Sequence, residues 1–189
     1  QKIGWSQLQI MPGERHGMPG VEIVDLGHLE FALLGTPQQL DVGARAFIDA
    51  DWRLQEFEAS VRSSAYQLRW TGRRSGDALE FSVSTPMSTV TKRLHDPSGS
   101  AFVSGLSPWA AFHRLRVGQS GRVWALNPMA LDPETVYFAV RRKETLEGRD
   151  VLVVETDVSG LTTTSWVTPD GDVLKELSPT GWELRRVSR

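Results

Sequence analysis

The sequence predicts a mainly β protein built on a curved antiparallel sheet. Three observations lead to this expectation. Apolar and polar residues alternate with a period of two in most apolar segments. Turn segments that contain glycine or proline separate these runs at intervals of roughly 10–15 residues. The chain also carries seven tryptophans, and aromatic residues favour strands.

The predicted strands follow one another along the chain as a meander. Successive side chains of a strand point to opposite sides of the sheet, so strict alternation indicates one apolar and one solvated face. This pattern predicts strands over residues 3–10, 21–31, 54–61, 66–70, 79–83, 136–140, 151–154 and 182–187. Residues 11–20 are rich in glycine and proline, and we expect them to form a loop between the first two strands.

Four short segments have the composition of hairpin turns. They are residues 73–77, 146–150, 169–172 and 179–181. Each supplies a glycine for positive φ or a proline for fixed φ, as a tight connection between antiparallel strands requires. The segment Asp170-Gly171-Asp172 resembles the start of a calcium loop, but the alternating oxygen ligands and the closing glutamate are absent. A hairpin turn is therefore the prediction there as well.

Residues 107–115 predict the one helix. Ser107 is a suitable N-cap, and Pro108 suits the first helical position. Trp109, Phe112 and Leu115 are three residues apart, which places them on one face of a helix of about two turns. We expect this short helix to plug the open sheet with that apolar face.

Composition and charge limit the possible functions. The 189 residues suit a single domain, and no linker-like tract divides residues 1–189. Twenty-one basic against 23 acidic residues argue against a nucleic-acid partner, which would need an excess of lysine and arginine. No apolar run approaches the ~20 residues of a membrane-spanning helix. The chain contains no cysteine, which excludes disulfides, thiolate metal ligands and cysteine nucleophiles.

No motif indicates catalysis. The four histidines, His16, His28, His95 and His113, lack the short spacings typical of metal sites. The nucleophile-elbow pattern Gly-x-Ser-x-Gly is absent, and the glycines of residues 13–20 precede a strand rather than a helix, so they do not form a phosphate loop. We therefore expect no catalytic residues, no metal site and no cofactor, and no enzymatic activity.

Apolar side chains form the only candidate site. The inward-facing residues of the predicted sheet and helix are Trp70, Phe81, Trp109, Phe112, Leu115 and Phe138. Two interpretations stay open at this point. They pack the core, as aromatic residues commonly do, or they line a concave apolar surface that accepts a lipid or a partner chain.

Two segments carry a resemblance to known domains. Residues 1–6, Gln-Lys-Ile-Gly-Trp-Ser, resemble the opening strand of a bacterial extracytoplasmic domain that precedes transglutaminase-like domains. Residues 132–135, the hairpin at 144–149 and the Trp-Val-x-x-x-Gly-x-Val-Leu hairpin at 166–174 are similar to the end of secreted β-domains of unknown function with the lipoprotein-carrier (LolA-like) fold.

The resemblance implies a fold, a location and a role. The fold would be a half-barrel wrapped around a short plug helix. The protein would lie in the periplasm or cell envelope, as part of a longer secreted or membrane-tethered protein. It would serve as a non-catalytic accessory or interaction domain, with a transglutaminase-like domain of the same polypeptide or another protein as its partner. The alternative is a carrier that holds a lipid or other apolar ligand in the concave face of the sheet.

Overall fold

The computed structural model describes residues 3–33, 36–96, 101–102, 115–127 and 132–187. Every regular element among these residues is a strand, which confirms the prediction of a mainly β fold. The chain divides into two compact units, residues 1–102 with 128–132 and residues 103–127 with 133–189. The prediction of one domain over residues 1–189 stays a prediction.

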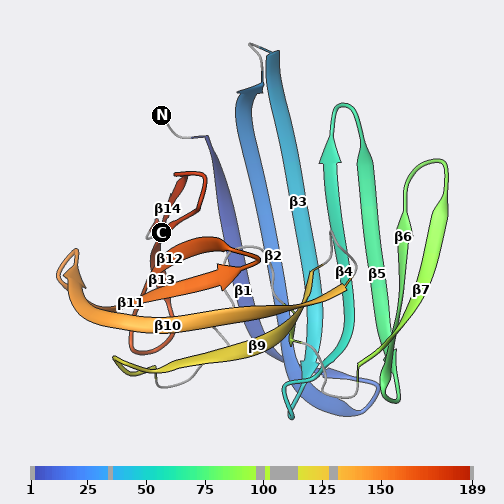
Figure 1. The fold of residues 1–189 in the computed structure, drawn as a ribbon. Helices are drawn as coiled ribbons and strands as arrows, with labels where there is room; N and C mark the ends of the chain where they lie inside the picture. The colour runs from blue at the N-terminus through green and yellow to red at the C-terminus, as the bar shows by residue number, and fades with distance from the viewer. Residues whose placement is uncertain (1–2, 34–35, 97–100, 103–114, 128–131, 188–189) are drawn as a thin grey trace. The chain divides into compact units, whose positions relative to one another are not determined.

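The first sheet is a seven-stranded meander in which each strand pairs antiparallel with the next one along the chain (Figure 1, blue to green). Two long strands, β2 and β3, are paired from Gly20 opposite Asp49 to Leu33 opposite Thr36. Because the order in the sheet is the order in the sequence, β1 and β7 are its two edges. The strands are β1 (Gly4–Arg15), β2 (Met18–Leu33), β3 (Thr36–Asp49), β4 (Leu54–Ser63), β5 (Gln67–Ser75), β6 (Ala78–Ser84) and β7 (Thr89–His95).

The second sheet also has seven strands in sequence order (Figure 1, orange and red towards the C-terminus). Pairing from β10 to β14 is antiparallel throughout. The strands are β8 (Ala101–Phe102), β9 (Ser120–Asn127), β10 (Asp132–Leu146), β11 (Arg149–Val158), β12 (Leu161–Val167), β13 (Val173–Leu177) and β14 (Glu183–Arg185).

All four predicted turns connect adjacent strands of a sheet. Each contains a glycine in the left-handed region: Gly76, Gly148, Gly171 and Gly181 have φ between 63° and 94°. A residue with a Cβ atom is strained in that region, so these positions favour glycine. The turn composition therefore located the connections correctly.

The predicted loop at residues 11–20 is wrong, because β1 and β2 run through it and meet in a two-residue turn. His16 and Gly17 have φ of 54° and 78°, as in the type I′ turn that suits the twist of a hairpin. Pro12 lies in an edge strand, where its missing N–H costs no ladder bond. Gly20 lies in β2 under the ring of Phe47, since a Cβ atom at Gly20 would lie 2.7 Å from Phe47 Cζ.

One face of the first sheet is apolar and buried. Ala59 on β4 lies opposite Trp70 on β5, and Phe57 lies opposite Gly72. A Cβ atom at Gly72 would lie 2.2 Å from Phe57 Cε1, so the phenyl ring covers the glycine. Aromatic rings that cover glycines on a neighbouring strand fix the register of a sheet.

The second unit has its own core. The buried cluster consists of Leu115, Phe138, Val140, Leu152, Val154 and Val167, with Val173 packed against it. Strand β11 is buried on both faces from Val151 to Val154, as its uninterrupted apolar sequence predicts. Ser165 and Glu176 are also buried, and the Ser165 hydroxyl donates to Glu176 Oε2 over 3.0 Å.

Most of the predicted plug helix, residues 107–114, lies outside the described residues. Leu115 is described, and it is buried without belonging to a helix or strand. The part of the chain that the structure describes contains no helix with the length and hydropathy needed to cross a membrane.

Candidate functional site

The second face of the first sheet is polar, and its charged side chains gather where β1 to β5 lie side by side. Strand register places Glu22 opposite Phe47, Phe47 opposite Glu56, and Glu56 opposite Arg73. Directly opposite residues share a face of the sheet. A single row across four strands therefore holds two carboxylates, one phenyl ring and one guanidinium group.

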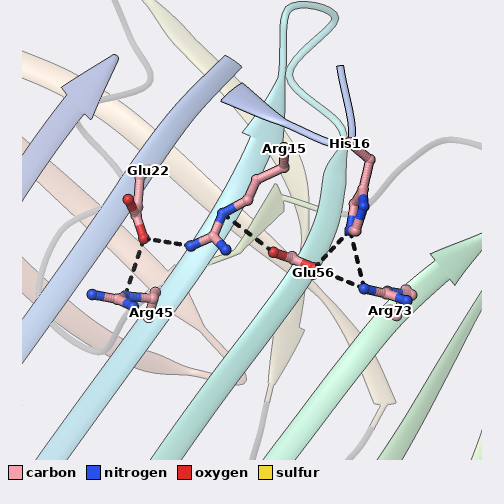
Figure 2. Close-up of polar contacts among 6 residues, drawn as sticks. All are labelled: Arg15, His16, Glu22, Arg45, Glu56 and Arg73. Atoms are coloured by element: carbon pink, nitrogen blue, oxygen red, sulfur yellow. Dashed lines mark hydrogen bonds and ion pairs between the residues drawn. The ribbon is translucent and has the colours of Figure 1, made fainter. Parts of the chain in front are cut away.

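Three more side chains complete this group, which we call the arginine cluster: Arg15, His16, Glu22, Arg45, Glu56 and Arg73 (Figure 2). Arg15 ends β1, and His16 lies in the turn that follows. Arg45 comes from β3, two residues before Phe47, so it projects from the same face. Six residues spread over positions 15–73 thus meet through the register of five strands.

Ion pairs connect the members of the arginine cluster. Glu22 Oε1 lies 3.0 Å from Arg15 Nη2 and 3.0 Å from Arg45 Nε. Glu56 is held more loosely, with Oε1 3.5 Å from Arg15 Nε and Oε2 3.5 Å from Arg73 Nη2. Charge-assisted hydrogen bonds are usually 2.7–2.9 Å long. The carboxylate of Glu56 is therefore surrounded by cations without a close hydrogen bond to either arginine.

His16 contacts both Arg73 and Glu56. Its Nε2 lies 3.1 Å from Arg73 Nη2 and 4.0 Å from Glu56 Oε2. A guanidinium group only donates hydrogen bonds, so Nε2 is the acceptor in this contact. Three guanidinium groups then face two carboxylates, and the cluster carries one positive charge in excess.

The arginine cluster borders a pocket of about 170 Å³. Phe47 lies at its base and is only 2% exposed, while the side chains of His16 and Arg73 at its rim are each 67% exposed. The pocket thus combines a buried phenyl ring with basic side chains at its exposed rim. Its lining residues are Arg15, His16, Met18, Phe47, Gln55, Glu56, Arg73 and Arg74.

Arg74 belongs to a separate, buried ion pair. Its Nη2 lies 2.6 Å from Asp96 Oδ2, and its Nε and Nη1 donate to the carbonyl oxygens of Leu54 and Asp96. Both charged side chains are less than a tenth exposed. This pair connects the end of β7 to the start of β4, and its charge is already balanced.

A second titratable group lies further along the polar face. His28 Nδ1 is 2.7 Å from Asp41 Oδ1, and Nε2 is 3.2 Å from Glu30 Oε1. The hydrogen bond to Asp41, followed by that to Glu30, raises the pKa of His28 above its usual value near 6.5. The indole of Trp5 on β1 stacks on this imidazole with 6.5 Å between ring centroids.

A third polar group lies on the second sheet. Trp166 Nε1 donates to Glu144 Oε2 over 2.9 Å, and Lys175 Nζ lies 4.7 Å from the centre of the Trp166 ring. The hydrogen bond from Trp166, and then that from Arg142, lowers the pKa of Glu144. Within the described residues, no group of three histidine, aspartate or glutamate side chains is placed to hold a metal ion.

The open edge of the first sheet is another candidate site. Strand β1 is twelve residues long, and residues 4–11 include no charged side chain. Trp5 and Met11 on one face, and Leu8 and Ile10 on the other, are 39–46% exposed. Long, apolar, uncharged edges are uncommon because they attract further strands. The opposite edge, β7, carries Lys92 and Arg93, as edges that avoid pairing usually do.

The hydrogen-bonding direction along β1 follows from its pairing with β2. Glu30 N–H donates to the Ile3 carbonyl oxygen, and residues in an antiparallel pair alternate between bonding inward and facing outward. Gly4, Ser6, Leu8 and Ile10 therefore direct their N–H and C=O groups away from β2. Pro12 is the next outward-facing residue, and it has no N–H to offer.

The predicted apolar residues are separated between the two units. Trp70 and Phe81 lie on the apolar face of the first sheet and are 3% and 2% exposed. Leu115 and Phe138 pack together in the core of the second unit. Trp109 and Phe112 lie outside the described residues. The four described residues are thus buried, and sequence reasoning did not find the arginine cluster or the β1 edge.

Comparison with known proteins shows the fold alone. No protein-family model and no curated protein matches the sequence. The chain is similar to the crystal structure of a DUF1089 family protein from Pseudomonas aeruginosa, with 20% identity, a TM-score of 0.55, and 99% of this chain and 94% of that one covered. It is also similar to a β-barrel-like protein of the domain of unknown function DUF1849 from Brucella abortus, with 11% identity, a TM-score of 0.58, and 92% and 91% covered.

The chain is therefore a β domain with the fold of β-barrel-like proteins of unknown function. The finer resemblance, to transglutaminase-associated domains and to the lipoprotein-carrier fold, stays a prediction. Localisation in the periplasm or cell envelope also stays a prediction.

Proposed function

We propose that this protein is a non-catalytic interaction domain that associates through the open edge of β1. The observation that carries the proposal is the exposed, uncharged stretch of residues 4–11 on a sheet edge. The outward-facing N–H and C=O groups there have no partner strand in the first sheet, and an added strand would give them a ladder of backbone bonds.

The occupant we propose is a second copy of the same chain. In an antiparallel pair centred on Gln7, Ser6 lies opposite Leu8 of the second copy, and Gly4 lies opposite Ile10. Every outward-facing residue then meets another outward-facing residue, so all their donors and acceptors are paired. Moving the centre one residue towards the C-terminus would place Pro12, which lacks an N–H, opposite Gly4. Residues 4–10 are thus complementary to themselves.

Charge also favours a second copy. Like charges directly opposite each other destabilise a strand pair, and a charged edge repels its own copy in a symmetric pairing. Residues 4–11 contain no such charge, so no like-charge repulsion within this stretch opposes self-pairing. The apolar side chains of Leu8 and Ile10 would lie beside Ser6 and Gly4 of the second copy, and part of their exposed surface would be removed from water.

Sedimentation equilibrium between roughly 1 and 300 µM tests the proposal. Leu8→Lys places a cation on the edge, and Val90→Lys is the matched control on β7, where Val90 is also exposed. We expect the wild type and Val90→Lys to form dimers, with dimerisation of Leu8→Lys at least about tenfold weaker. Ser6→Pro removes one outward N–H without removing a bond to β2 and should also weaken the dimer. A monomeric wild type at 300 µM, or equal dimerisation of all variants, would overturn the proposal.

Two further hypotheses stay predictions. In one, the domain is an accessory to a transglutaminase-like domain of the same polypeptide, and the β1 edge would then pair with that neighbour. In the other, it carries a lipid or other apolar ligand against Trp70 and Phe81. Since both rings are almost fully buried, a hydrocarbon chain would reach them only after neighbouring groups move. Displacement of a fluorescent fatty-acid probe tests the carrier hypothesis.

A further inference from the structure

We propose that the pocket beside the arginine cluster binds a small organic anion that carries a flat apolar group. The anionic oxygens would contact Arg73 and Arg15 at the rim, and the apolar group would lie towards Phe47. This site is separate from the β1 edge and does not depend on the proposed self-association.

The charge of the pocket argues for an anion. Three guanidinium groups face two carboxylates in the arginine cluster. The nearest further carboxylates, Glu80 opposite Arg73 and Glu58 opposite Arg45, pair with Arg93 and Arg69, so one positive charge stays in excess. Arg73 is the most exposed of the three and reaches Glu56 only over 3.5 Å. Its planar group presents several N–H donors, which suit a carboxylate or phosphate. Arg73 is therefore the principal anion-binding residue of the proposal.

Glu56 marks where the anionic oxygens would lie. Arg15, Arg73 and His16 all direct a nitrogen towards its carboxylate, at 3.5, 3.5 and 4.0 Å. A ligand carboxylate or phosphate near this point would accept hydrogen bonds from Arg15 and Arg73 at shorter distance. Because Glu56 repels and competes with a ligand anion, its charge should limit the affinity of the site.

The shape of the pocket indicates the rest of the ligand. A cavity of roughly 150 Å³ accommodates one benzene ring, and this pocket has a volume of about 170 Å³. Phe47 and Met18 supply its apolar lining, and Phe47 is held in place across Gly20. A ring that replaces water against these side chains gains hydrophobic free energy that a bare inorganic anion does not.

Isothermal titration with phenyl phosphate as the probe tests the inference, with inorganic phosphate and phenol as its two halves. We expect phenyl phosphate to bind at least about tenfold more tightly than either half. Inorganic phosphate bound as tightly as phenyl phosphate would overturn the apolar part of the proposal. Absence of phenyl phosphate binding at 10 mM would overturn the whole of it.

Three variants give opposite and null results. Arg73→Gln should weaken phenyl phosphate binding about fivefold or more, because it removes the principal donor. Glu56→Gln should strengthen it about threefold or more, because it removes the competing carboxylate. Arg69→Gln is the matched control on the same strand. Arg69 pairs with Glu58 and does not line the pocket. The affinity of this variant for phenyl phosphate should therefore stay within twofold of wild type. Weaker binding in Glu56→Gln, or equal affinity in Arg73→Gln and Arg69→Gln, would contradict the inference.

Discussion

Gly72→Ala tests the packing of the first sheet most sharply. Carbon atoms in contact usually lie about 3.5–4.0 Å apart, whereas a Cβ atom at Gly72 would lie 2.2 Å from Phe57 Cε1. The phenyl ring would have to move by roughly 1.5 Å, and Phe57 is only 4% exposed. Overpacking of this kind costs about 1–3 kcal/mol. Loss of glycine entropy in the unfolded chain offsets about 0.4–1 kcal/mol of that.

The expected net effect is a decrease of about 1–2 kcal/mol in the free energy of unfolding. For a chain of this length, that corresponds to a fall in Tm of roughly 2–8 °C. Thermal and urea unfolding followed by circular dichroism measure it. Gly27→Ala is the matched control, since Gly27 also lies in a strand and its Cβ atom would meet only ordinary contacts, 3.7 Å from the Trp5 carbonyl oxygen and 3.9 Å from Val42 Cβ.

A double-mutant cycle identifies the cause. In a Phe57→Leu background the ring is gone, so Gly72→Ala should cost about 1 kcal/mol less than in the wild type. If Gly72→Ala unfolds at the same temperature as Gly27→Ala, the ring does not cover Gly72 and the register argument fails. An equal cost of Gly72→Ala in both backgrounds would refute the assigned contact.

Two further predictions concern charged groups. Arg74→Ala should lower the free energy of unfolding by about 3–5 kcal/mol, because it breaks a buried ion pair by removing the guanidinium group that lies 2.6 Å from Asp96 Oδ2; a loss below about 1 kcal/mol in urea unfolding would contradict this. The pKa of His28 is raised in the folded state, so its stabilising contribution is complete below its unfolded pKa of about 6.5 and is lost as the pH rises through the folded value. An NMR titration should show a lower His28 pKa in Asp41→Asn but an unchanged one in Asp150→Asn, and equal values in the two variants would refute the role of Asp41.

The local pattern of the sequence predicts eight of the fourteen strands and all four of the expected hairpin turns, for a physical reason. Alternation and turn composition act over a few residues, and the turns at Gly76 and Gly148 form where they were expected. The same rules misplaced residues 11–20, because Pro12 lies on a sheet edge and Gly20 lies beneath a phenyl ring. Both are tertiary facts that local composition does not contain.

The arginine cluster was not predictable from single segments. Arg15, Glu56 and Arg73 lie in three different strands, and only the pairing register brings them together. The alternation of apolar and polar residues also failed to predict strand β3. This strand lies between β2 and β4 and pairs with both. A correct register for the meander would have placed Glu56 opposite Arg73 and indicated a charged row.

Amide exchange along β1 tests the proposed self-association most directly. In the monomer, the outward-facing amides of Gly4, Ser6, Leu8 and Ile10 have no partner in the sheet and should exchange rapidly with solvent. Raising the protein concentration from about 10 to 300 µM should slow exchange at these four amides, while the inward-bonded amide of Gln7 should change little. Exchange at Ser6 and Leu8 that does not depend on concentration would contradict the central claim of this account.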